Sequence, residues 1–394
     1  MGRLRVGPPR PWLGYWPEPE DDPGVEPHRE PLALISPDGA IVRGVLWTPS
    51  NGRWSTAIVL THPRGDFSVH YACPLLAAAG FAVFGFATRY VNNDTDCLHD
   101  SCVIDVRTAV DEMRRRGAAT LVALGNSGGG SLMALAQTQG GIDADGFMAV
   151  AAHPGEGVFM MQVIDPSVTD EADPFSLDES LDMYHPDNGW RPWPEPCLYS
   201  SDFIARYRAA QHDRVARIDA RAKEMMAFRS TSQEELRHAE PGSTSWSMAR
   251  RRSVFGPYLT IHRTLADPAY LDLTIDPDDR PMGSVFAAGD PLVANYGYGG
   301  LARVMTARGW LSTWSGLSSE ARLAVTMPHV ACPTLIIHPT GDTEIRLRQA
   351  DEIRDSAGAT DLTYHRLIGA PHYLHGHRRE AADIMIQWCR ERFT

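Results

Sequence analysis

The chain has 394 residues, of which 43% are hydrophobic and 22% charged, and its 49 acidic residues outnumber the 37 basic ones for a formal net charge of -12. This composition predicts a globular protein with a buried core, and the acidic balance argues against nucleic acid or an anionic membrane as a partner. No run approaches the roughly 20 apolar residues of a membrane span, and the proline-rich start lacks the apolar centre of a secretory signal. We therefore expect a cytoplasmic protein.

The six cysteines are scattered and form neither a CxxC pair nor a cluster with histidines at zinc spacing. Such cysteines in a cytoplasmic protein are expected to be reduced and mostly buried. The sequence therefore predicts no metal site, and it implies no organic cofactor.

Residues 1–30 are rich in proline, with Trp12, Tyr15 and Trp16 interspersed. Proline lacks a backbone donor and breaks helices and central strands, so this segment is predicted to form an extended arm. Its aromatic residues favour packing on the body of the protein or on a second subunit of a homodimer. A disordered leader is the alternative.

From residue 31 the sequence alternates short apolar runs with amphipathic segments. Residues 31–36 and 40–47 flank Pro37-Asp38-Gly39 and predict a hairpin, because Asp-Gly accepts the positive φ angles of a tight turn. The uninterrupted apolar run at 56–61 is typical of a strand buried on both faces. The following segments predict a β-α-β series, with helix 69–79, strand 82–86, helix 101–116, strand 121–124, helix 129–137 and strand 146–152.

Residues 154–329 interrupt this series. They contain proline-rich loops, many tryptophans and one long amphipathic helix at 202–227, but no convincing core strand. The alternation returns with strand 334–338, helix 345–356, strand 362–367 and helix 379–392. The sequence therefore predicts one α/β domain, built from residues 31–153 and 330–394, with a large insertion between its two parts.

The sharpest chemical motif is Gly125-Asn126-Ser127-Gly128-Gly129, a G-x-S-x-G between a predicted strand and a predicted helix. A nucleophile on such a turn has almost no room around it, so the flanking glycines have a steric reason to be small. A phosphate-binding loop is the alternative, but the motif lacks the Lys-Ser/Thr of a Walker sequence and the spacing of a dinucleotide fingerprint. Ser127 is thus the candidate nucleophile.

A serine hydroxyl needs a base, and the base needs an orienting acid. Asp342 follows the predicted strand 334–338, and His372 follows the strand 362–367 in a Gly-x-x-His turn. Both residues come just beyond the carboxyl end of a strand, as Ser127 does. The three side chains are therefore expected to converge at one edge of the sheet.

Each partner has competitors in the sequence. His375 and His377 lie close to His372, but only His372 comes directly after the glycine turn. Glu156 and Asp165 follow the sixth predicted strand and are alternative acids. The Gly-Asp pair directly after an intact strand favours Asp342.

The elbow, the two post-strand turns and the chain order Ser127, Asp342, His372 resemble the α/β-hydrolase superfamily. The resemblance covers the two core segments, about half of the chain. It implies a mostly parallel eight-stranded sheet flanked by helices, a catalytic triad of these three residues, and hydrolysis through a covalent serine intermediate.

Acyl transfer also needs donors for the developing oxyanion. The amide of Gly128 is the first candidate. The superfamily pattern after the third strand is His-Gly-X, with X donating its amide, whereas this chain has Pro63 in place of the glycine. Because proline has no N–H, Arg64 is the expected second donor and Gly65 the fallback.

The insertion 154–329 fits a mainly helical cap over the sheet edge that carries the site, where it would form pocket walls. Its size and aromatic content predict a moderately large apolar or aromatic small molecule as substrate. The candidate substrate contacts are Trp190, Trp193, Trp310 and Trp314.

We therefore expect a serine hydrolase that cleaves a carboxylic ester. The same triad serves the hydrolysis of carbon–carbon bonds in diketones and of amides or lactones, which are alternatives. A non-catalytic binding module on the same fold is a third class. Such modules typically lose a triad residue, and here all three are present.

Overall fold

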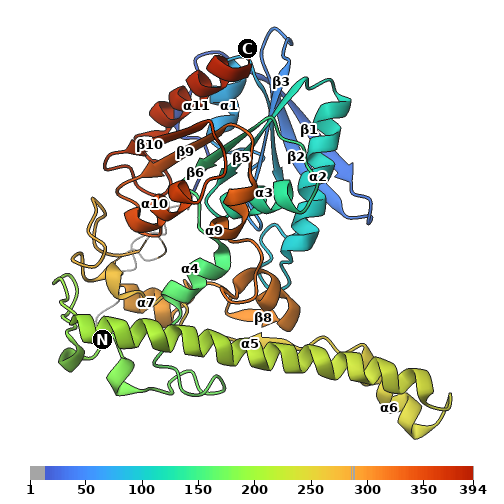
Figure 1. Cartoon of the computed structure of the whole chain (residues 1–394), viewed down its shortest axis with the longest axis vertical. Helices are drawn as coiled ribbons and strands as arrows, with labels where there is room; N and C mark the ends of the chain where they lie inside the picture. Colours follow the sequence, from blue (N-terminus) through green and yellow to red (C-terminus); the bar gives the residue numbers. More distant parts are fainter. Residues whose placement is uncertain (1–13, 285, 287–288, 394) are drawn as a thin grey trace, which may run out of the picture.

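The computed structural model describes residues 14–284, 286 and 289–393. Its centre is a sheet with the strand order β1-β2-β4-β3-β5-β6-β9-β10 (Figure 1). β2 pairs antiparallel with β1 and β4, and every other pair in this sheet is parallel. The predicted mostly parallel eight-stranded sheet is thus confirmed. Its strands are β1 (His28–Ile35), β2 (Ile41–Thr48), β3 (Thr56–Thr61), β4 (Ala82–Ala87), β5 (Thr120–Asn126), β6 (Gly146–Val150), β9 (Thr334–Pro339) and β10 (Leu362–Leu367).

The burial of each strand follows its apolar pattern. β3, β4, β6 and β9 are buried along their whole length, whereas the edge strand β1 is mostly exposed. Successive residues of β3 alternate between the faces, so that Val59 packs into one core cluster and Ile58 into the other. The turn between β1 and β2 has Gly39 at φ 87°, as the predicted Asp-Gly hairpin requires.

Helices cover both faces of the sheet (Figure 1). α2 and α3 contribute apolar side chains to the cluster on one face, and α1 and α11 to the cluster on the other. The helices outside the insertion are α1 (Ala72–Ala78), α2 (His99–Arg115), α3 (Gly128–Thr138), α10 (Leu347–Asp355) and α11 (Arg378–Phe393). α1 begins later than the predicted start at residue 69, with Tyr71 as its N-cap residue. Just before it, the Nδ1 atom of His70 accepts the amide of Ala72.

The insertion between β6 and β9 is mainly helical and lies beyond one end of the sheet (Figure 1). It has hydrophobic clusters of its own, separate from the two that sandwich the sheet. Its elements are α4 (Glu156–Val163), α5 (Ser201–His238), α6 (Thr244–Ser253), β7 (Tyr258–Thr260), α7 (Pro291–Tyr296), β8 (Val304–Thr306), α8 (Ala307–Gly309) and α9 (Leu323–Thr326). The short antiparallel pair β7–β8 was not predicted from the sequence.

Helix α5 is longer than the predicted 202–227 and continues to His238. Its last turns lack an apolar stripe because they project from the body of the protein, alongside α6 (Figure 1). Hydrogen bonds tie the two helices together, since Arg229 and Gln233 both donate to the carbonyl oxygen of Ser253. Periodicity therefore located the part of α5 that packs on the insertion and missed its projecting end, residues 228–238.

The described part of the N-terminal arm, residues 14–27, packs on the core, and β1 begins at His28, inside the predicted arm. The buried guanidinium of Arg378 donates to the carbonyl oxygens of Gly14 and Trp16 and pairs with Asp21 at 2.8 Å. Trp12 lies outside the described residues. None of the helices in the described ranges is both long and apolar enough to span a membrane.

Candidate active site

Ser127 lies on the sharp turn between β5 and α3. Its backbone has φ 55° and ψ -131°, a strained conformation for a residue with a side chain. A Cβ at Gly125 would lie 2.5 Å from Cα of Gly130, and one at Gly129 would collide with the carbonyl oxygen of Thr61. The glycines that flank Ser127 are therefore required by close backbone approach, as the motif predicts.

The structure brings Ser127, His372 and Asp342 together. Oγ of Ser127 lies 3.1 Å from Nε2 of His372, and Nδ1 of His372 lies 2.7 Å from Oδ2 of Asp342. All three residues are buried. Since the ionised Asp342 can only accept, it holds the proton of His372 on Nδ1, and Nε2 is left as an acceptor that faces the serine hydroxyl.

The electrostatics of this pair match the roles of base and orienting acid. Burial alone would lower the pKa of His372, but the Asp342 carboxylate, with Glu344 and Glu156, outweighs it and raises that pKa above its usual value. Burial would raise the pKa of Asp342, yet His372 and the amide of Glu344 lower it below the usual value. Asp342 thus stays ionised and stabilises the imidazolium.

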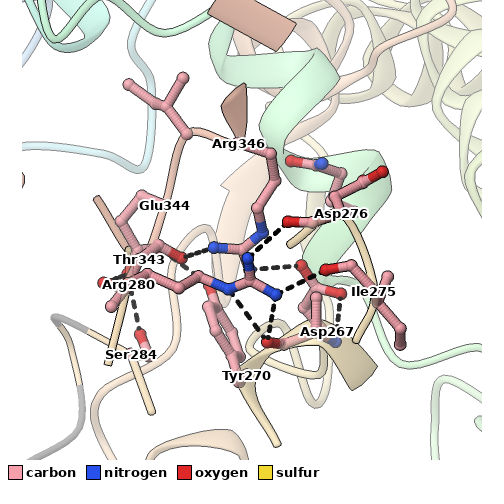
Figure 2. A network of polar contacts seen from close by, with 12 residues as sticks. Asp267, Tyr270, Ile275, Asp276, Arg280, Ser284, Thr343, Glu344 and Arg346 are labelled. Carbon is pink, nitrogen blue, oxygen red and sulfur yellow. Dashed lines mark hydrogen bonds and ion pairs between the residues drawn. The ribbon is translucent and has the colours of Figure 1, made fainter. Parts of the chain in front are cut away.

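The loop that carries Asp342 is fixed from two sides. The amides of Glu344 and Ile345 donate to Oδ1 of Asp342 at 2.7 and 3.1 Å. Figure 2 shows the carboxylate of Glu344 next to Ser284 of the insertion, and Tyr270 also donates to it, at 2.8 Å. The insertion therefore holds the residue whose amide orients the candidate acid.

An ion pair in Figure 2 also joins this loop to the insertion. Arg346 pairs with Asp267 at 3.0 Å and donates to the carbonyl oxygen of Thr343. Both Arg346 and Asp267 are almost fully buried. Asp267 also pairs with Arg208 of α5, at 2.5 Å, so Arg346 ties the loop to a carboxylate that the insertion already holds.

The alternative acid Asp165 and the alternative bases His375 and His377 have partners outside the triad. Asp165 accepts from Ser167 at 2.6 Å and lies 3.2 Å from Asn295, inside the insertion. His375 faces Glu18 at 3.3 Å, and His377 faces Glu380 at 3.2 Å.

Glu156 is buried beside the elbow, with one carboxyl oxygen 3.7 Å from Nε2 of His62 and the other 3.8 Å from Nδ1 of His153. It therefore faces two histidines other than His372.

The candidate oxyanion donors differ in availability. Gly128 begins helix α3, so its amide is one of the first-turn donors without a partner inside the helix. The amides of Arg64 and Gly65, in contrast, both point at Nδ1 of His62, at 3.2 and 3.1 Å. The two amides expected as second donors thus already have an acceptor.

The same two contacts fix the tautomer of His62. Because its Nδ1 accepts from amides, the ring proton resides on Nε2. Burial and the nearby Arg64 hold the pKa of His62 well below its usual value, so the ring is neutral. A Cβ built on Gly128 would lie 2.9 Å from Nε2 of His62. His62 therefore presents an N–H next to the first oxyanion donor.

Tyr15, from the N-terminal arm, also reaches the site. Its hydroxyl lies 3.1 Å from Nε2 of His372 and accepts from Nδ2 of Asn126 at 3.3 Å. Asn126 is itself held by the carbonyl oxygen of Val150 at 2.7 Å and by Nε2 of His70 at 2.9 Å. Apart from the aromatic residues in the arm, no pattern in the sequence indicates this contact.

The four tryptophans proposed as substrate contacts lie in different surroundings. Trp310 is fully buried and its Nε1 donates to Asp219 at 2.7 Å within the insertion. Trp314 is fully buried and its ring faces the guanidinium carbon of Arg64 at 5.1 Å. Trp190 and Trp193 are partly buried and pack on a cluster of the insertion that includes Tyr199.

No protein-family model and no curated protein sequence matches this chain. Solved structures do resemble it. DcsB, solved with its substrate analogue, has 13% identity and a TM-score of 0.52, over 93% of this chain and 99% of that one. The α/β hydrolase GrgF from Penicillium sp. sh18 has 12% identity and a TM-score of 0.50, over 93% and 99%. Est1E from Butyrivibrio proteoclasticus has 9% identity and a TM-score of 0.50, over 92% and 98%.

At these identities the likeness concerns the fold. The chain has the α/β-hydrolase fold, as the sequence motifs predict.

Proposed function

We propose that the protein is a serine hydrolase that cleaves a carboxylic ester of a moderately large apolar or aromatic small molecule. The observation that carries the proposal is the continuous chain of contacts from Oγ of Ser127 through His372 to Asp342, at 3.1 and 2.7 Å. A non-catalytic module has no need to keep this geometry, which includes a strained backbone at Ser127.

The reaction follows from the protonation states. Nε2 of His372 takes the proton of Ser127 as Oγ attacks the carbonyl carbon of the ester. The amide of Gly128 stabilises the negative charge that forms on the carbonyl oxygen. When the intermediate collapses, the alcohol leaves with the proton from His372, and the acyl group stays on Oγ.

Water then completes the cycle. It gives one proton to His372, attacks the acyl carbon, and releases the carboxylic acid as the proton returns to Oγ. Ser127 is only 5% exposed, so bulk water is largely excluded from the reacting atoms. In this scheme residues 154–329 act as the cap that selects the substrate.

The test is labelling of the protein with a fluorophosphonate probe, followed by mass spectrometry. The proposal expects label on Ser127 in the wild type and none in Ser127→Ala, with turnover lost in both Ser127→Ala and His372→Ala. Absence of label on the wild type, or equal labelling of Ser127→Ala, would show that Ser127 is not an activated nucleophile.

A further inference from the structure

Four polar side chains beside Ser127 have no part in the triad. They are His62 and Arg64 from the loop after β3, and His153 and Glu156 from the segment after β6, and we call them the polar subsite. Glu156 lies within 3.7 to 3.9 Å of a nitrogen atom on each of the other three. His153 is tied to the elbow because its amide donates to the carbonyl oxygen of Ser127 at 3.0 Å.

The carboxyl group of Glu156 occupies the space that a side chain at position 128 would fill. A Cβ on Gly128 would collide with Oε1 of Glu156. Gly128 is also the residue whose amide is the available oxyanion donor. A group bound by Glu156 would therefore sit close to the carbonyl carbon that Ser127 attacks.

Polar atoms of the subsite are buried without hydrogen-bond partners among the described residues. They are Nε of Arg64, both ring nitrogens of His153 and both carboxyl oxygens of Glu156. Native proteins rarely leave a buried polar atom unpaired, because each one costs stability. So many unpaired atoms in one place, next to a nucleophile, indicate a site whose partners arrive with a ligand.

The chemistry of the subsite selects the kind of group that binds. Arg64 Nε and His62 Nε2 are donors. Burial lowers the pKa of His153 to about 3, so its neutral ring offers one donor and one acceptor. Burial also raises the pKa of Glu156 despite the nearby Arg64, and its oxygens accept, with one of them donating when protonated. A partner must therefore both donate and accept.

The charged residues around the polar subsite restrict the kind of group that it can bind. A carboxylate would meet Glu156 and also Asp94, which lies 3.7 Å from Arg64. An ammonium group can only donate, so it would leave the donors Arg64 Nε and His62 Nε2 without an acceptor. In the described ranges no group of three His, Cys, Asp or Glu side chains has the geometry to hold a metal ion. A neutral hydroxyl satisfies donors and acceptors together and adds no charge.

We propose that the polar subsite binds a hydroxyl group on the acyl part of the substrate, close to the scissile carbonyl, so that the enzyme acts on esters of hydroxy acids. This inference rests on the hydrolase function proposed above. It refines the apolar or aromatic substrate expected from the cap by adding one required polar group beside the reacting carbon.

The test compares phenyl butyrate with phenyl 3-hydroxybutyrate and phenyl 3-methoxybutyrate, with fluorophosphonate labelling of Ser127 measured on the same preparations. The 3-hydroxy ester is expected to exceed the other two in kcat/KM by at least about tenfold, because neither of them can donate to the subsite.

Glu156→Leu is expected to reduce this preference to within about twofold, since it removes both unpaired oxygens of the subsite. The matched control is Glu352→Leu, which changes a half-exposed glutamate on α10 and should keep the wild-type preference. His153→Phe keeps a ring but removes both unpaired nitrogens, and it is expected to reduce the preference in the same way.

Thermal unfolding distinguishes a binding role from a structural one. An unpaired buried carboxyl destabilises the free protein, so Glu156→Leu is expected to keep or raise the Tm. A clear fall in Tm would mean that Glu156 supports the fold, and would overturn the assignment.

The outcomes separate the two proposals. If Ser127 is labelled but the wild type hydrolyses phenyl butyrate as fast as the 3-hydroxy ester, or hydrolyses neither, the hydroxyl subsite is wrong and the nucleophile assignment stands. A preference that survives both Glu156→Leu and His153→Phe also overturns the subsite. If Ser127 is not labelled, the hydrolase function itself fails.

Discussion

The hydroxyl of Tyr15 lies 3.1 Å from Nε2 of His372, the same nitrogen that lies 3.1 Å from Oγ of Ser127. Burial raises the pKa of Tyr15 well above its usual value, so its hydroxyl keeps its proton. Nε2 of the neutral ring has a single lone pair, and two hydroxyl groups compete for it. Tyr15 of the N-terminal arm therefore competes with Ser127 for the lone pair on Nε2 of the candidate base.

Removing this hydroxyl should change the pH dependence of the reaction. A hydrogen bond to Nε2 stabilises the neutral ring and so lowers the pKa of His372. In Tyr15→Phe that pKa should rise, and the acid limb of the kcat/KM profile should move to higher pH. The shift should be between about 0.4 and 1 pH unit, from a hydrogen bond worth about 0.5–1.5 kcal/mol. A profile of a phenyl ester from pH 5 to 9 measures it, and an unmoved or lowered limb would show that Tyr15 does not act on His372.

We expect Tyr15 to contact His372 only while Arg378 holds the N-terminal arm in place. Arg378→Met leaves Asp21 buried without its charge partner, which should lower the free energy of unfolding by about 3–5 kcal/mol. Denaturant unfolding measures the loss, with Arg348→Met, at a half-exposed arginine, as the control.

Once the arm is released, the acid limb of kcat/KM should move to higher pH as in Tyr15→Phe, and combining the two substitutions should add nothing further. An acid limb like that of the wild type in Arg378→Met would mean that other contacts hold Tyr15 in place.

The acid is expected to be Asp342, because it alone of the candidates lies at Nδ1 of His372. Asp342→Asn should lower kcat by about 10⁴-fold, since the amide no longer holds the ring proton on Nδ1. The residual activity should have its acid limb at lower pH, because the carboxylate that raises the pKa of His372 is gone. Wild-type kcat in Asp342→Asn beside an inactive Glu156→Gln would instead assign the acid to the segment after β6.

The sequence was sufficient for the parts of the site that follow from local pattern and topology. Ser127 lies in a motif whose glycines have a steric cause, and Asp342 and His372 each follow a recognisable strand. Because parallel strands present their carboxyl ends at one edge of a sheet, the sequence predicts that these residues converge there. The eight-stranded sheet and the triad were expected from the resemblance to the α/β-hydrolase superfamily, and the strand order that makes the three residues neighbours is seen only in the structure.

The other contacts depend on side-chain directions that have no sequence pattern. Tyr15 and His372 are 357 positions apart, and the arm has no periodicity that could reveal their contact. The expected donors Arg64 and Gly65 are taken up by His62 because of how one ring is turned. Glu156 is the first residue of α4 and follows Gly155, whose φ is 151°, and no pattern in the sequence predicts this helix.

The two fully buried tryptophans of the insertion should have different effects when replaced. Trp310→Phe removes the hydrogen bond to the buried Asp219 and should lower the free energy of unfolding by about 1–3 kcal/mol, with the ranking of ester substrates unchanged. Trp314 packs against Arg64, so its replacement should act on substrate choice. Trp314→Leu removes the aromatic face under the guanidinium and should lower kcat/KM for phenyl 3-hydroxybutyrate by about three- to tenfold relative to phenyl butyrate.

Trp314→Phe is the matched control, because it keeps an aromatic face for Arg64 and should retain most of the preference. The measurement is kcat/KM over phenyl acetate, butyrate, 3-hydroxybutyrate and benzoate, with labelling of Ser127 to show that the nucleophile is intact. Trp190→Ala and Trp193→Ala complete the series for the cap. The insertion would not be the selectivity element if all of these variants kept the wild-type ranking with acetate as the best ester, because a cap that contacts the substrate must discriminate between acyl groups.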